Sequence, residues 1–141
     1  MRSIATTFTI LVLCSCVNKE PKKEINYVLD SLHHLASLAD EKKYINLFSK
    51  DAIFFGTDIS ERWPKNEFKL YVKSRFDTGI GWTYKPINRN IFISNNERVA
   101  WFDEILFNEK YGEFRGTGVL IIENGEWKIC LLYTSPSPRD P

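Results

Sequence analysis

Residues 99–129 read VAWFDEILFNEKYGEFRGTGVLIIENGEWKI, and this stretch decides the fold class. Apolar and polar residues alternate through it, which indicates half-buried β-strands. Polar turn residues separate the runs, and Asn124-Gly125 is the strongest two-residue hairpin signal in the chain. The pattern predicts strands at residues 98–107 and 113–122, and a further strand that begins at Trp127, joined as an antiparallel meander.

Upstream of these strands, apolar residues recur mainly at helical spacing. The expected elements are a helix from about Glu24, a second at residues 40–48 capped by Asp40, a strand at 52–55, a third helix with Pro64 in its first turn, and a strand at 82–93. Helices gathered before a run of antiparallel strands predict an α+β domain.

Composition narrows the possible functions. The 141 residues are enough for one domain, and a formal net charge of +1 with scattered Lys and Arg gives no support for nucleic-acid binding. Aromatic residues make up 14% of the chain, enough to fill a core or to line an apolar pocket. The cysteines lack zinc-ligand spacing, and adjacent His33 and His34 point different ways around a helix. We interpret both His as surface or boundary residues, and expect neither a metal nor a cofactor.

The first sixteen residues predict a targeting segment. Arg2 precedes an apolar run at residues 4–13, which is too short to span a bilayer. Leu13-Cys14-Ser15-Cys16 is similar to a bacterial lipobox, so Cys16 is the expected site of acylation and residues 17–23 the tether. We expect a lipoprotein of the bacterial cell envelope, held at the membrane by its lipid anchor alone. An ordinary signal peptide, or a start codon placed too early, is the alternative.

The end of the chain has a different character. Residues 130–140 read CLLYTSPSPRD, which resembles the in-frame translation of a transposase adapter used in sequencing libraries. We therefore expect residues 130–141 to be read-through sequence, with the domain at residues 24–129. A disordered terminus is the alternative, because Pro136 and Pro138 cannot donate to a strand ladder. Residues 130–134 are nevertheless strand-like.

Five motifs carry a resemblance to a known family. They are Gly56-Thr57-Asp58 with Glu61 and Trp63, Gly81-Trp82-Thr83-Tyr84, VAWFDE at 99–104, RGTGVL at 115–120 and NGEWKI at 124–129. The combination resembles the nuclear transport factor two-like superfamily, in particular its SnoaL-like branch. The resemblance implies helices packed over a strongly curved antiparallel sheet that encloses a pocket, as in a cone. Relatives include ketosteroid isomerase, polyketide cyclases, dehydratases and non-catalytic binding modules, so the fold does not settle the reaction.

Two expected turns, at Asn95-Asn96 and around Lys110, set the strand registers. The expected pairs are Phe102 with Arg89 and Gly118, and Glu104 with Ile87 and Gly116. The face that carries Glu104 is the more apolar one and contains the glycines, so we expect it to be concave and covered by helices.

Glu104 is the candidate catalytic residue, because a carboxylate in an apolar pocket can act as a general base. A structural ion pair with Arg89, which is also a candidate ligand-binding residue, is the alternative. A one-residue register slip would place Asp103 inside instead, which makes Asp103 the reserve candidate. On the expected register Asp103 lies outside with Trp101, on a surface suited to a homodimer.

Further ligand-binding candidates lie near the third helix. Asp58 and Glu61 could receive polar ligand groups at the pocket mouth, or only form a local turn. Trp63 and Trp82 could form an aromatic lid, or only fill the core. With one pocket carboxylate and no oxyanion donor identified, we favour a lipid-anchored module that binds a small apolar or carbonyl-containing ligand. A cofactor-independent isomerase, dehydratase or cyclase and a dimeric interaction domain are the alternatives.

Overall fold

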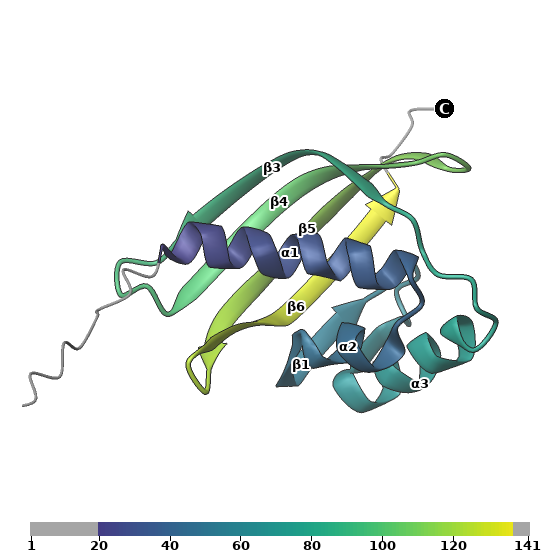
Figure 1. The fold of residues 1–141 in the computed structure, drawn as a ribbon, viewed down its shortest axis with the longest axis horizontal. Coiled ribbons are helices and arrows are strands. Elements are labelled where there is room, and N and C mark those ends of the chain that lie inside the picture. Colours follow the sequence, from purple (N-terminus) through teal and green to yellow (C-terminus); the bar gives the residue numbers. More distant parts are fainter. Residues whose placement is uncertain (1–19, 137–141) are drawn as a thin grey trace, which may run out of the picture.

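The computed structural model describes residues 20–136, which form three helices and six strands (Figure 1). In chain order they are α1 (Pro21–Ser37), α2 (Glu41–Asn46), β1 (Phe48–Phe55), β2 (Arg62–Pro64), α3 (Lys65–Phe76), β3 (Lys85–Ile93), β4 (Val99–Asn108), β5 (Gly112–Glu123) and β6 (Glu126–Pro136). The strands build one curved sheet. Helix α1 crosses a face of this sheet, and α2 and α3 lie together at one end, near β1 (Figure 1). The α+β fold class predicted from the sequence is confirmed.

Helix α1 begins at Pro21, three residues before the expected start, so part of the expected tether is helical. Proline suits the first turn of a helix, where its missing N–H is not needed. The buried stripe of the helix consists of Ile25, Leu29, Leu32 and Ala36, which recur every three or four residues and pack against the sheet. The predicted lipobox, including Cys16, lies outside the described residues. Within residues 20–136, no helix combines the length and the apolar character that crossing a membrane would require.

The boundary between α2 and β1 differs from the expectation. Asp40 caps α2 as predicted, and its carboxylate accepts a hydrogen bond of 3.0 Å from the backbone N–H of Lys43. The helix ends at Asn46, however, and Phe48 begins β1 instead of ending α2. The backbone N–H of Ile129 donates to the carbonyl of Leu47 at 2.9 Å, so pairing with β6 replaces the last helical turn.

Strand β2 was not expected from the sequence. Its three residues follow the expected strand at 52–55 and pair antiparallel with the end of β1, with Trp63 opposite Phe54. Pro64 is consequently the last residue of β2 and the residue before α3, not part of the first turn of that helix.

The strand order is β2-β1-β6-β5-β4-β3. Strands β3 to β6 form the predicted antiparallel meander, but β1 runs parallel to β6, so the sheet is mixed. The connection between β1 and β6 contains α3 and four strands, and a connection of that length allows either direction. Residues 130–136 form the second half of β6, and their origin in an adapter stays a prediction.

The β4–β5 register is the predicted one, with Phe102 opposite Gly118 and Glu104 opposite Gly116. The β3–β4 register differs by two residues, since Phe102 pairs with Ile91 and Glu104 pairs with Arg89. The turn is centred one residue later than expected and closes where the backbone N–H of Ser94 donates to the carbonyl of Val99 at 2.9 Å.

The shift by two residues leaves the sheet faces unchanged, because side chains alternate with a period of two. Ala100, Phe102, Glu104, Leu106 and Leu120 are all buried beneath the helices. On the opposite face, Phe92, Val99 and Trp101 are exposed. The predicted concave face is therefore the buried one.

Candidate functional site

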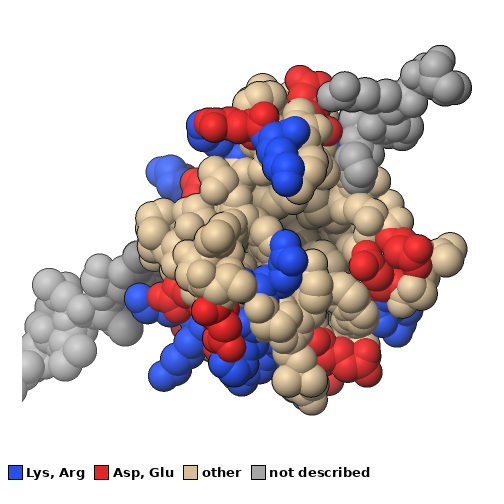
Figure 2. Space-filling view, turned by 90° about the vertical axis from the view of Figure 1, so that its right-hand side faces the viewer, with Lys and Arg blue, Asp and Glu red and all other residues tan. Residues whose placement is uncertain are grey.

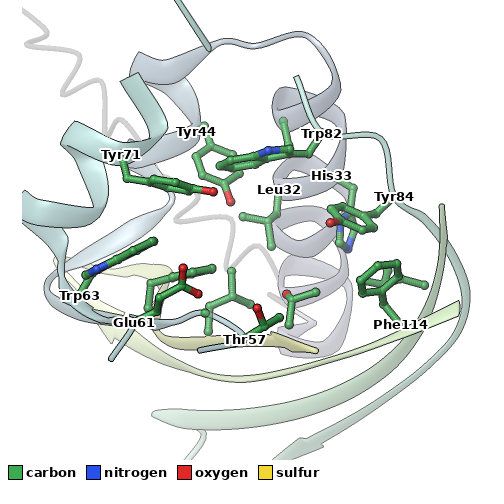
Figure 3. A pocket seen from close by; sticks show the side chains of 16 residues that line it. Leu32, His33, Tyr44, Thr57, Glu61, Trp63, Tyr71, Trp82, Tyr84 and Phe114 are labelled. Atoms are coloured by element: carbon green, nitrogen blue, oxygen red, sulfur yellow. The ribbon is translucent and has the colours of Figure 1, made fainter. Parts of the chain in front are cut away.

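A cavity of about 220 Å³ lies between α1, α3, the β1–β2 connection and the sheet (Figure 3). Leu32, Ala36 and Leu106 contribute aliphatic surface, and Thr57 contributes a hydroxyl. The aromatic side chains that line it are Tyr44, Phe54, Trp63, Tyr71, Trp82, Tyr84 and Phe114. The high aromatic content of the chain thus builds a pocket wall as well as a core.

Trp63 and Trp82, the two predicted lid residues, both line this cavity. Their rings lie on either side of Tyr71 of α3, with centroids 4.5 Å and 5.9 Å from the Tyr71 ring. The backbone N–H of Trp82 donates to the carbonyl of Ala36 at the end of α1, at 3.0 Å. A side chain at Gly81 would collide with that same carbonyl, so a glycine is required for the approach.

Glu104 is buried, with 1% of its side chain exposed, and holds two partners. Arg89 Nε donates to Oε2 at 2.9 Å, and His33 Nε2 lies 2.7 Å from Oε1. Arg89 Nη1 also donates to Asp30 on α1 at 2.7 Å and to Asn26 at 3.1 Å. The ion pair considered as an alternative for Glu104 is present, and Glu104 itself does not line the cavity.

His33 is a partly buried boundary residue, and it also lines the cavity, which the sequence did not reveal. Only 11% of its side chain is exposed, whereas His34 is exposed as expected. The signal that could have revealed it is the spacing of Asn26, Asp30 and His33, which share one helix face. The polar groups that this face meets, Arg89 and Glu104, lie on strands far away in the sequence.

The contacts of Glu104 determine the proton position on His33. A carboxylate paired with an arginine accepts hydrogen bonds, so neutral His33 carries its proton on Nε2. Nδ1 is then an acceptor, and it has no hydrogen-bond partner among residues 20–136. A ring so held can take a proton from a bound molecule while Glu104 stabilises the resulting imidazolium.

Tyrosine hydroxyls supply the donors that sequence analysis did not identify. Burial raises the pKa of Tyr44, and nearby Tyr84 and Tyr71 add to the effect. Burial likewise raises the pKa of Tyr84. Both phenols are therefore protonated donors at neutral pH. The hydroxyls of Tyr44, Tyr71 and Tyr84 point toward the middle of the cavity (Figure 3).

The two carboxylates predicted at the pocket mouth, Asp58 and Glu61, have different positions. Glu61 lines the cavity, but Asp58 does not. Asp58 accepts hydrogen bonds from the backbone N–H of Ser60 at 2.8 Å and from its hydroxyl at 2.5 Å, and these bonds lower the pKa of Asp58. Asp58 therefore forms a local turn, which was the alternative to binding a ligand.

Asp103 faces away from the cavity. Its carboxylate accepts a hydrogen bond from Asn90 at 3.2 Å and lies 3.7 Å from Arg115, on the outer face of the sheet. The reserve role required a register slip of one residue, and the β4–β5 register contains none. Among residues 20–136, no three His, Cys, Asp or Glu side chains are grouped so that they could hold a metal ion.

Comparisons with known proteins agree with this fold. The model of the SnoaL-like domain family matches residues 25–137. The fold is similar to a candidate ketosteroid isomerase from Parabacteroides distasonis (16% identity, 87% of this chain and 92% of that chain, TM-score 0.69). It is also similar to a candidate scytalone dehydratase from Novosphingobium aromaticivorans (12% identity, 83% and 84%, TM-score 0.68). The association domain of C. elegans CaMKII is a third similar structure (18% identity, 81% and 94%, TM-score 0.66).

The chain has the nuclear transport factor two-like fold, a cone of helices over a curved sheet, which other similar solved structures share. The chain belongs to the SnoaL-like domain family, whose model covers most of its length. No curated protein sequence matches it.

The contacts of Arg89 predict a large stability effect. Arg89→Met removes the cation beside buried Glu104, and an uncompensated buried charge costs about 3–5 kcal/mol of the free energy of unfolding. Arg115→Met is the matched control, because its pair with Asp103 lies on the outer face and Arg115 is 62% exposed. We expect that change to cost less than about 1 kcal/mol. Urea denaturation measures both, and equal small losses would contradict the importance of the buried pair.

Proposed function

We propose that the cavity binds a small, largely apolar ligand with a carbonyl group, and that His33 transfers a proton on that ligand. The reaction class is a cofactor-independent isomerisation or dehydration. The observation that supports this most directly is the position of His33, which lines the cavity while its Nε2 is held by Glu104. Glu104 is then a positioning residue, not the general base considered from the sequence.

The proposed step uses groups that the cavity already contains. Nδ1 of His33 removes a proton from the carbon next to the carbonyl, and the electron pair moves onto the carbonyl oxygen. That oxygen accepts a hydrogen bond from Tyr44 or Tyr84, whose hydroxyls point into the cavity. The electron pair then moves back from that oxygen. In an isomerisation the imidazolium returns the proton to the far carbon of an adjoining C=C bond, and in a dehydration it gives the proton to the hydroxyl that leaves from the β-carbon.

Binding without chemistry is the second candidate. Arg89 already neutralises Glu104, and a buried pair of this kind is compatible with a purely structural role. The relatives with similar folds include one named for isomerisation, one for dehydration and one for association, so their names favour no single function. Proton transfer is what separates the two candidates experimentally.

Solvent exchange tests the proton transfer directly. We expect the protein to accelerate deuterium exchange at the carbon next to the carbonyl of small cyclic ketones in D₂O, followed by NMR. His33→Gln should lower that acceleration by about 10²-fold or more, because it removes the base. His34→Gln is the control and should leave the rate unchanged, since His34 is exposed on the other side of α1.

Quenching of tryptophan fluorescence by the same ketones measures binding separately, because Trp63 and Trp82 line the cavity. Ketones that bind without faster exchange would establish the non-catalytic candidate. Unchanged exchange in His33→Gln would remove His33 from the mechanism.

We also propose that the protein is a lipoprotein of the bacterial cell envelope, anchored by acylated Cys16, which follows a short apolar run and Ser15. Metabolic labelling with a fatty-acid analogue should tag the protein in cells. Cys16→Ala should abolish the label, and Cys14→Ala should retain it, because only Cys16 follows a small residue. Labelling that persists in Cys16→Ala would contradict the anchor.

We infer, finally, that the outer face of the sheet forms a homodimer. Phe92 and Trp101 stack there with ring centroids 5.9 Å apart and remain about half exposed. Asp103 and Arg115 beside them allow self-complementary pairing around a two-fold axis. Sedimentation velocity should show a dimer that Trp101→Ala weakens and Tyr27→Ala, on exposed α1 surface, does not. A monomeric parent protein would contradict this interface.

A further inference from the structure

The residues that line the cavity are unevenly charged. Glu61 is the one carboxylate among them, and no Lys or Arg belongs to the described lining. The surface at the end of the molecule where α3 and its connection to β3 lie is mostly uncharged, but one Lys or Arg side chain lies near its centre (Figure 2). The other charged side chains gather mainly toward the edges of that view. A ligand inside the cavity therefore meets the Glu61 carboxylate and aromatic surface, and the ring of His33 is the one basic group in the described lining.

Glu61 is held in place by its own loop. The backbone N–H of Gly56 donates to the Glu61 carbonyl at 2.9 Å, and the N–H of Asp58 donates to Oε2 at 3.2 Å. The Glu61 side chain lies so close over Gly56 that a Cβ there would collide with the carboxylate. Among residues 20–136, Glu61 forms no ion pair, although its charge faces a partly enclosed space.

The aromatic wall has the same electrostatic preference. The faces of Trp and Tyr rings carry negative potential, and a cation within about 6 Å of a ring centroid is attracted to it. The rings of Trp63, Tyr71 and Trp82 form one wall, and the Glu61 carboxylate points into the space beside Trp63 and Tyr71 (Figure 3). The carboxylate and the ring faces thus favour positive charge at one place.

We propose that the ligand of this cavity carries a positively charged amine, held between Glu61 and the aromatic wall of Trp63, Tyr71 and Trp82. This inference rests on one part of the proposed function, that the cavity binds a ligand, and it adds that the ligand is cationic. A neutral ligand would exclude water from Glu61 without supplying a counter-charge, which is unfavourable. An anionic ligand would be repelled.

One end of the cavity would then bind the ligand and the other end would react with it. Glu61 and His33 lie on opposite sides of it (Figure 3). The amine would be anchored at the Glu61 side while the carbonyl-bearing part reaches His33 and the tyrosine hydroxyls. Binding energy from the non-reacting end would in this way orient the reacting end.

A pair of isosteric probes tests the charge preference. Benzyltrimethylammonium and its uncharged carbon analogue neopentylbenzene have nearly the same shape and differ in charge. Titrations followed by tryptophan fluorescence should give a dissociation constant at least about tenfold lower for the cation. Glu61→Gln, which keeps the shape and the acceptor for Asp58 N–H, should reduce that preference to about threefold or less. Glu67→Gln, on the exposed first turn of α3, should retain it.

The outcomes separate this inference from the proposed function. Equal binding of both probes, or tighter binding of neopentylbenzene, overturns the cationic ligand and leaves the cavity as a ligand site. A cation preference that is unchanged in Glu61→Gln overturns the role of Glu61. Failure of both probes to bind, in a protein whose unfolding curve is normal, counts against the inference and the ligand site together.

Discussion

The fold depends on one contact between helix and sheet, in which Arg89 joins buried Glu104 to Asp30 on the exposed surface of α1. Glu104 lies on the concave face of β4 with almost no exposed surface, so its charge requires a partner. Arg89 on the neighbouring strand supplies it, and the other end of the guanidinium reaches α1. The second oxygen of Glu104 holds His33 one turn further along that helix. A single carboxylate thereby fixes the position of α1 over the sheet and the orientation of a cavity-lining imidazole.

The aromatic residues complete the cavity from the opposite side. Phe54 stacks on Phe68 with centroids 4.1 Å apart, which joins β1 to α3, and Trp63 and Tyr71 continue this packing to the cavity surface. Trp82 closes the wall because its backbone is hydrogen-bonded to the end of α1. The elements that carry the acid–base groups and those that carry the aromatic wall are therefore packed on one another. The shape of the cavity follows from core packing, and its polarity follows from a few residues.

Sequence patterns predicted the element types and the buried face of the sheet, because both follow from local periodicity. Glu104 was placed on the correct face for the same reason. Trp63 and Trp82 were placed beside the cavity because they flank the third helix. His33 was missed because its partner lies 71 positions away, and helical spacing cannot show what faces a helix across a sheet. The parallel pairing of β1 with β6 was missed because it depends on long-range contacts, whereas β2 was missed because its three residues are too few to show an alternating pattern. The pairing partner of Glu104 was missed because the turn is centred one residue later than its sequence indicates.

The direction in which the Arg89 side chain points depends on the number of residues in that turn. Strand β4 is held in register by β5, so the direction of Glu104 does not depend on the β3–β4 connection. The direction of Arg89 does, because β3 is registered through the turn between Ser94 and Val99. An insertion or deletion of one residue there would turn Asn88 and Asn90 inward and leave Glu104 without its cation. A change of two residues would leave the same face of β3 directed inward. Homologous β3–β4 turns should therefore differ in length by even numbers wherever an arginine on β3 pairs with a buried acid on β4.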